Sequence, residues 1–500
     1  MAKKGLLEAL IESLNQSELK RFTLYTKTYA SNKSYMELFK AIRSHKHKKP
    51  EKYSNKYAQQ RRYLYRIILE SLIQKSDKSI ENEVLFFIKA ANYLLKKQLA
   101  ENAYQMVNKA LSIVTKYEMI GFHLEVIEIE KQIRIYMNPP GHRSDAEIMK
   151  EEMDLLEQQK QLQVLKIAHN HILNYKKRFG YIDDSRWNIL RKEVRDMGFI
   201  DEVKNCYTQK AQYYFYYNQA LLNWIKHNHT EAYEHTSNLI KIKPEPLTKQ
   251  EYLNALLEHS SSCYCLGKTN EILSTLSRVQ DLHKKGVFGK FENITLKIFY
   301  YRSNYELSAY VFMGQEENVK KKLLEIEEGM AHWDDKIPLA MKMILATGLK
   351  LGYLATGEFK KMAKEINFLV NNYKSGLRLD AFEDGLMWQL IYTYMKDDMD
   401  FLEKQAKYAY KHFSNKQNKD DQDVKFKIDT SRLFLEYSQS LWSKREFLLK
   451  FKNLLDTKLS HFNNHFSEID YPYLIWVNSQ ISGKPFLDAA YEMSHQYLNK

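Results

Sequence analysis

Apolar residues recur along this chain at intervals of three, four and seven positions, the spacing that places side chains on one face of an α-helix. The stretch 57–73, for example, carries Leu64, Ile67 and Ile68 at such intervals. The stretch 145–178 contains no Gly or Pro and repeats its apolar positions every seven residues. It predicts one continuous helix of about 50 Å, because an α-helix rises 1.5 Å per residue.

Short polar or Gly-containing turns separate the apolar stretches and reveal a period. The clearest are Leu266-Gly267, Met313-Gly314 and Thr356-Gly357, at spacings of 47 and 43 residues. Weaker equivalents are Lys97-Gln98, His227-Asn228 and Asp397-Asp398. A helical hairpin buries its apolar stripe only against the next hairpin, so this spacing predicts a stacked α-solenoid.

Helix starts are marked by capping boxes, in which a Ser, Thr or Asn is followed three residues later by Glu. The pairs with this spacing are Asn15 and Glu18, Ser34 and Glu37, and Thr248 and Glu251.

Composition supports a helical chain. The 500 residues include only 16 Gly and 8 Pro, under half of the roughly 12% that proteins use on average. Sandwiches and barrels need these residues for turns, so the predicted fold class is all-α. The three cysteines are too few for a disulfide framework, and no secretion signal or stretch long enough to span a bilayer is apparent. We therefore expect a cytoplasmic protein that is not embedded in a membrane.

The segment 213–244 resembles the tetratricopeptide repeat family. Ala220 and Ala232 stand where that family places small residues at the crossing of its two helices, and Pro244 follows at the end of the second helix. The segment 253–284 fits the same frame with Ser260 at the close contact. The repeats of this chain are longer than the family's period of about 34 residues, so the resemblance is to divergent members with long helices.

The resemblance implies a concave groove lined by exposed positions of each first helix. Carried over place by place, the peptide-groove candidates are Tyr214, Tyr217, Trp224, Asn254, Tyr264, Tyr301 and Asn304. Aromatic and Asn side chains suit an extended peptide, which they hold by apolar contact and by hydrogen bonds to its backbone. The expected function is a non-enzymatic scaffold that binds a protein or peptide partner, although some of these side chains could instead pack against the adjacent repeat.

Positive charge is concentrated at the start of the chain. Residues 1–80 contain 18 Lys or Arg and 7 Asp or Glu, which accounts for +11 of the overall +14. The polyanion-binding candidates are Lys46, Lys48, Lys49, Arg61, Arg62 and Arg66. Together with interleaved tyrosines they offer phosphate contacts and stacking surfaces, so a nucleic-acid-associated regulator is the alternative function. A solvated helical cap or an acidic protein partner explains the same charge.

These patterns divide the chain into five parts. They are a basic helical module (1–80), the first hairpins (81–140), a long helix with its connector (141–200), the solenoid core (201–413) and C-terminal hairpins (414–500). The breaks rest on Pro139-Pro140-Gly141 and on the polar stretch 414–423. The seven-residue seam of 145–178 suits either packing within the chain or a coiled-coil dimer, which leaves the oligomeric state open.

Motifs for catalysis, cofactors or metals are weak. Gly267-Lys268-Thr269 lacks the first glycine of a phosphate-binding loop, since position 262 is Ser. His461 and His465 lie four apart, but Phe462 stands where a metalloprotease has Glu. Cys263 and Cys265 diverge on a helix and suit structural burial. We expect no cofactor, no metal and no enzymatic activity; a hydrolase with an unrecognised site is a third, motif-free hypothesis.

Overall fold

The computed structural model describes residues 6–29, 34–44, 55–76, 79–137, 143–182, 184–199, 202–289, 291–372, 377–416, 422–461 and 470–497. Within these ranges every regular element is a helix and no strand is present, which confirms the all-α prediction. The chain forms two compact units, Met1–Thr115 with Gly121–Ser144 and Lys116–Ile120 with Asp145–Lys500. The finer division into five parts stays a prediction.

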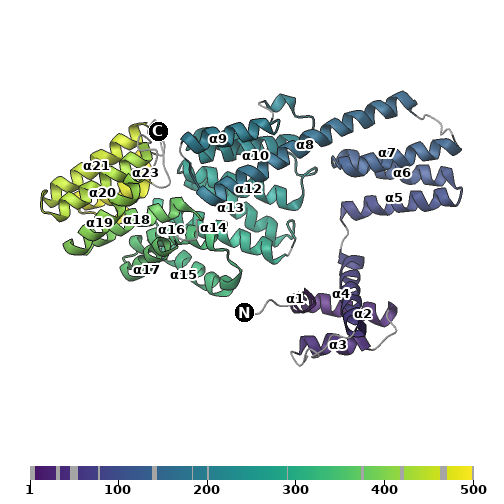
Figure 1. The fold of residues 1–500 in the computed structure, drawn as a ribbon, viewed down its shortest axis with the longest axis horizontal. Helices are drawn as coiled ribbons and strands as arrows, with labels where there is room; N and C mark the ends of the chain where they lie inside the picture. Colours follow the sequence, from purple (N-terminus) through teal and green to yellow (C-terminus); the bar gives the residue numbers. More distant parts are fainter. Residues whose placement is uncertain are drawn as a thin grey trace. The chain divides into compact units, whose positions relative to one another are not determined.

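The first unit contains seven helices among the described residues (Figure 1). They are α1 (Leu6–Ser13), α2 (Gln16–Tyr29), α3 (Ser34–Arg43), α4 (Asn55–Ser76), α5 (Ile80–Lys96), α6 (Ala100–Lys116) and α7 (Ile120–Tyr136). The last residue of α6 and the first residue of α7 are assigned to the second unit.

The N-terminal helices α1 to α4 share a small hydrophobic core of their own, centred on Phe22, Leu64 and Ile68. The capping box predicted at the start of α2 is confirmed: the backbone N–H of Glu18 donates to Asn15 Oδ1 at 3.0 Å, and that of Asn15 to Glu18 at 2.8 Å. The sequence signals at Asn15, at Ser34 and in the stretch 57–73 correspond to α2, α3 and α4, and a further helix, α1, also buries an apolar stripe.

The second unit contains the rest of the helices. They are α8 (Asp145–Phe179), α9 (Asp184–Asp196), the 3₁₀ turn η1 (Val203–Asn205), α10 (Gln209–Ile225), α11 (His229–Leu239), α12 (Lys249–Cys265), α13 (Thr269–Lys284), α14 (Glu292–Phe312), α15 (Glu316–Trp333), the 3₁₀ turn η2 (Asp334–Lys336), α16 (Leu339–Ala355), α17 (Phe359–Asn371), α18 (Leu379–Met395), α19 (Met399–Ser414), α20 (Gln422–Ser438), α21 (Lys444–His461), α22 (Asp470–Ser482) and α23 (Phe486–Tyr497).

From α10 onward each helix packs against the next, and the first helices of successive hairpins, α12, α14, α16, α18 and α20, also pack on one another. This sequential packing is that of a helical solenoid. It follows from the sequence because each second helix is amphipathic, whereas first helices such as α12 and α18 are buried on nearly every side.

The turns within the hairpins share one backbone conformation. Each has a residue with positive φ just after the first helix, at intervals of 40 to 47 residues: His227, Gly267, Gly314, Gly357, Asp397, Ser440 and Gly483. At Gly267 the N–H groups of positions 267 and 268 donate to the carbonyls of Tyr264 and Cys263, which is the bonding of a Schellman cap. The predicted repeat turns are therefore confirmed, including those in which His or Asp replaces Gly.

The long stretch 145–178 forms the single helix α8, as predicted. Its seven-residue seam, which includes Leu155, Leu162 and Ile172, is buried, and α8 packs against α10 within the second unit. The apolar seam is therefore covered by its own chain.

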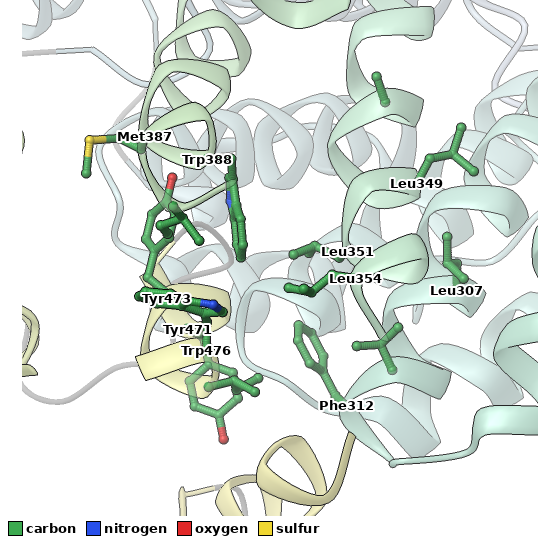
Figure 2. Packing of buried hydrophobic residues seen from close by; sticks show 14 of the residues in the cluster. Leu307, Phe312, Leu349, Leu351, Leu354, Met387, Trp388, Tyr471, Tyr473 and Trp476 are labelled. Carbon is green, nitrogen blue, oxygen red and sulfur yellow. The ribbon is translucent and has the colours of Figure 1, made fainter. Parts of the chain in front are cut away.

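The C-terminal hairpin α22–α23 returns to helices that lie far earlier in the sequence. The helix α23 packs against α14 and α16. Figure 2 shows the aromatic side chains of α22 beside α18, with the ring of Tyr473 centred 5.2 Å from that of Trp388. Phe312 of α14 meets Tyr471 at 5.7 Å between ring centres. One side of the stacked first helices is thus covered by the end of the chain.

Candidate functional site

The inner side of the second unit contains a partly open cavity. Including the part open to solvent, the space amounts to about 820 Å³, and side chains of α8, α10, α12, α14, α16, α18 and α22 line it. The lining residues are Lys176, Trp224, Ser261, Tyr264, Tyr300, Tyr301, Asn304, Tyr305, Ile344, Thr347, Lys350, Leu351, Arg378, Asp380, Ala381, Asp384, Trp388 and Pro472. We call this space the central cavity.

The central cavity brings together charged groups that are already paired. Lys350 Nζ lies 2.7 Å from Asp384 Oδ2, and Tyr473 donates its hydroxyl to the other oxygen of that carboxylate at 2.7 Å. Burial lowers the pKa of Lys350, and its pairing with Asp384 offsets only part of that effect. Arg378 donates to both oxygens of Asp380, at 2.8 and 2.5 Å. The lining therefore carries little unbalanced charge.

A third ion pair stands at the edge contributed by α8. Lys176 Nζ lies 2.7 Å from Glu258 Oε1 and 4.3 Å from the ring centre of Trp224. Trp224 is also stacked on Tyr181, with ring centres 4.3 Å apart. These contacts hold the Trp224 ring in one orientation in the cavity wall.

The two tryptophans of the lining have unsatisfied polar atoms. Trp224 and Trp388 are buried, and neither indole N–H has a hydrogen-bond acceptor among the described residues. A buried donor without an acceptor costs roughly 1–3 kcal/mol, and neither nitrogen is open to solvent, so these two donors lower the stability of the cavity wall. Tyr305, in contrast, donates its hydroxyl to Ser261 at 2.8 Å.

The structure collects four of the seven peptide-groove candidates in the central cavity: Trp224, Tyr264, Tyr301 and Asn304. They are buried or half-buried. The sequence predicted an exposed groove, but these residues line a partly enclosed space. The enclosure arises because the end of α8 and the helix α22 also contribute walls.

The other three candidates lie outside the lining. The hydroxyl of Tyr214 donates to Glu251 at 2.7 Å, and Tyr217 packs against His169 of α8 with ring centres 4.6 Å apart. Asn254 Oδ1 accepts a hydrogen bond from Lys297 at 2.6 Å. Tyr214 and Tyr217 therefore contribute to packing between α8, α10 and α12.

Sequence reasoning missed the charged half of the lining: Lys176, Lys350, Arg378, Asp380 and Asp384. Lys176 belongs to α8, which precedes the repeats, and the other four belong to repeats for which no groove positions were carried over. Extending the same helix positions to α16 and α18 would have reached Ile344, Thr347 and Asp384 of the lining but not Lys350. No sequence pattern connects Lys176 to them.

The basic N-terminal candidates are placed only in part. Arg61 forms a two-bond ion pair with Glu8, both contacts being 2.7 Å, and Arg66 pairs with Glu70 at 2.7 Å. Arg62 is exposed. Lys46, Lys48 and Lys49 lie outside the described residues, as do His465 and the side chain of His461. Through its pair with Glu8, the Arg61 guanidinium connects α4 to α1. Nucleic-acid binding stays a prediction.

A second cluster of reactive side chains lies between the helices α11, α12 and α13. His259 Nε2 is 3.0 Å from Glu271 Oε1 and 3.6 Å from Cys263 Sγ. Burial lowers the pKa of His259 and raises that of Cys263 well above the ordinary thiol value. Cys263 was expected to be buried for packing alone. The spacing of four residues between His259 and Cys263 is the signal that could have revealed the cluster.

No family model matches this chain, and no curated protein is significantly similar to it. The described helices include none with the length and apolarity needed to cross a bilayer.

Proposed function

We propose that this chain is a non-enzymatic interaction scaffold whose central cavity binds a short, uncharged segment of a partner protein. The observation that supports this function most directly is the gathering of Trp224, Tyr264 and Asn304 in a cavity wall whose charges are already paired. Aromatic rings and an amide of this kind bind the apolar side chains and the backbone groups of a short segment.

The size of the cavity favours a short ligand. The part of the space that a ligand atom can enter is about 120 Å³, below the roughly 300–1,000 Å³ that is usual for the sites of drug-sized ligands. A long peptide running along all the first helices would meet α22, which covers part of their inner side. The end of a chain or a tight turn of a few residues fits these limits.

Charge in the cavity favours a segment without net charge. Lys350 and Arg378 are neutralised by Asp384 and Asp380 at 2.7 and 2.5 Å. A charged ligand would have to compete with these buried pairs, and breaking one is costly. The aromatic ring of Tyr264 and the amide of Asn304 supply apolar contact and hydrogen bonds instead.

The test fills the cavity without touching its ion pairs. Thr347 is half-buried in the lining, and its hydroxyl bonds only to the carbonyl of Ile344 in its own helix. In Thr347→Phe the larger ring occupies the space. Tagged full-length protein is used to capture partners from native lysate. Overlapping peptides from each captured partner are then titrated into the purified protein, and binding is measured by calorimetry.

We expect wild type to bind one short peptide that Thr347→Phe binds at least tenfold more weakly. The matched control is Thr457→Phe, the same change at an exposed position of α21, which should bind as wild type does. Equal binding by both variants, or peptides recognised only when they carry several charges, would contradict the proposed site.

A further inference from the structure

The cluster of His259, Cys263 and Glu271 has the composition and spacing of a metal site. One ligand atom from each residue lies within 4.8 Å of the other two. His259 and Cys263 are four residues apart on α12, so they project from the same face of that helix. Glu271 belongs to the first turn of α13. The Schellman turn at Gly267 brings these two helices together.

The distances agree with tetrahedral coordination. With Zn–N near 2.05 Å and Zn–S near 2.3 Å, tetrahedral geometry separates the nitrogen and sulfur ligands by about 3.6 Å. The separation of His259 Nε2 from Cys263 Sγ is 3.6 Å. The corresponding N–O separation would be about 3.4 Å, against 3.0 Å between His259 Nε2 and Glu271 Oε1. A rotation of the carboxylate supplies the difference.

The surrounding hydrogen bonds orient the ligand atoms. His259 Nδ1 lies 3.2 Å from the hydroxyl oxygen of Thr236, whose own proton can be donated to the carbonyl of Tyr233 at 3.1 Å. With that arrangement Nδ1 carries the hydrogen, and the lone pair of Nε2 points toward Cys263 and Glu271. Metal-bound histidines are held in this way by a partner on the second ring nitrogen. The hydroxyl of Tyr233 donates to Glu271 at 3.0 Å and restrains the carboxylate.

A metal ion and a proton compete for His259 Nε2. Without a metal ion, neutral His259 can donate Nε2–H to Glu271 at 3.0 Å and accept at Nδ1 from the hydroxyl of Thr236. A metal ion takes the place of that proton, and Nδ1 then donates to the hydroxyl oxygen of Thr236. A divalent ion bound by a thiolate and a carboxylate is neutral as a group.

We propose that His259, Cys263 and Glu271 bind a Zn²⁺ ion that joins α12 to α13. The mixed nitrogen, sulfur and oxygen donor set is one that zinc accepts. Entry is from the side of Glu271, whose side chain is 36% exposed whereas that of His259 is 1% exposed. Water is the fourth ligand. This site is independent of the central cavity, since none of its three ligands lines that space.

The experiment adds Co²⁺, a spectroscopic substitute for Zn²⁺, to the reduced full-length protein. We expect one equivalent to produce a thiolate-to-cobalt charge-transfer band in the near ultraviolet, and Zn²⁺ to abolish it by displacement. Cys263→Ser should remove the band, and Glu271→Gln should weaken Zn²⁺ binding at least tenfold in competition with a chromophoric chelator.

The matched control is Cys265→Ser. Cys265 is also fully buried in α12, but it packs in the core shared with α8 and α10, whereas Cys263 packs in the core shared with α13. Its variant should keep the band. Thr236→Val and Tyr233→Phe remove the hydroxyl groups that orient His259 and Glu271. Each variant should bind zinc about 10- to 100-fold more weakly.

The cobalt titration has two outcomes that would overturn the zinc site. One is the absence of a stoichiometric band from wild type, and the other is the persistence of the band in Cys263→Ser. If Cys263→Ser fails to fold, Glu271→Gln decides the matter. Zn²⁺ should raise the melting temperature of wild type and not that of this variant, and equal shifts in both would also refute the site.

Discussion

The strongest test of the energetics concerns Glu383, a carboxylate of α18 with only 4% of its side chain exposed. One of its oxygens lies 2.9 Å from Lys427 Nζ, and the other pairs with Lys416 and lies 3.5 Å from His412 Nε2. Lys427 also contacts Asp423 at 2.5 Å. These contacts join α18, α19 and α20 in one buried network of charges.

We expect Glu383→Gln to destabilise this part of the unit by about 3–5 kcal/mol, because removing one partner of a buried ion pair leaves the other charge uncompensated. Every 1.4 kcal/mol corresponds to a factor of ten, so local opening should become more frequent by about 100-fold or more. A repeat array need not unfold in one step. The appropriate assay is therefore native-state hydrogen exchange, followed on peptides from α18, α19 and α20.

The matched control is Glu403→Gln. Glu403 pairs with Lys407 one turn away on α19, where the side chain of Glu403 is 35% exposed and that of Lys407 60%, and it accepts one further bond, from Gln439 at 3.3 Å. Surface pairs of this kind contribute little, so exchange should change only slightly. If the two variants exchanged alike, the network around Glu383 would not be a stabilising element.

The stability difference between wild type and Glu383→Gln should also depend on pH. Burial by itself raises the pKa of Glu383, but Lys427, His412 and Lys416 outweigh it and hold the pKa well below the ordinary 4.5. A carboxylate whose pKa is lower in the folded than in the unfolded state stabilises the folded protein at pH values above its unfolded pKa. This contribution is lost as the pH falls. The difference between wild type and Glu383→Gln should be constant from about pH 7 to 5 and should shrink below about pH 4.5.

Three further substitutions test local structure. Thr248→Ala removes the capping box with Glu251 at the start of α12; it should cost about 1 kcal/mol and lower the melting temperature, and an unchanged melting curve would deny the cap a role. Gly180→Ala combines a φ of +70° with a Cβ placed 2.3 Å from the carboxyl carbon of Asp380, whereas Gly357→Ala, with φ +75°, meets nothing within 4 Å. Gly357→Ala should lower the stability only by the roughly 1–2 kcal/mol of a left-handed backbone, and Gly180→Ala should lower it distinctly more. Thermal unfolding measures both losses. Equal losses would contradict the close contact with Asp380.

Much of the fold was predictable because its determinants are local. The helix α8, the capping boxes at Asn15 and Thr248, and the turns at Gly267 and Asp397 depend on residues within a few positions of one another. Periodicity and capping act over such distances. The helix α1 was missed although its apolar stripe is equally local.

The candidate sites were predictable only in part. Trp224, Tyr264, Tyr301 and Asn304 occupy the cavity wall because first-helix positions recur with the repeat. Tyr217 was assigned to the same wall, but α8 covers it. Nothing within one repeat indicates which neighbour from outside the repeats will pack there.

By itself, the amino-acid sequence determined the helical class, the hairpin period and the conformation of the turns, since each is decided by side chains close together along the chain. Only the tertiary structure decided that Lys176 of α8 and Asp384 of α18 line one cavity. It also decided that Tyr473 of α22 donates a hydrogen bond to Asp384. It likewise decided that His259 and Cys263 face Glu271. The physical reason is that small rotations between successive hairpins add up over many repeats, and their sum sets which distant side chains come within contact.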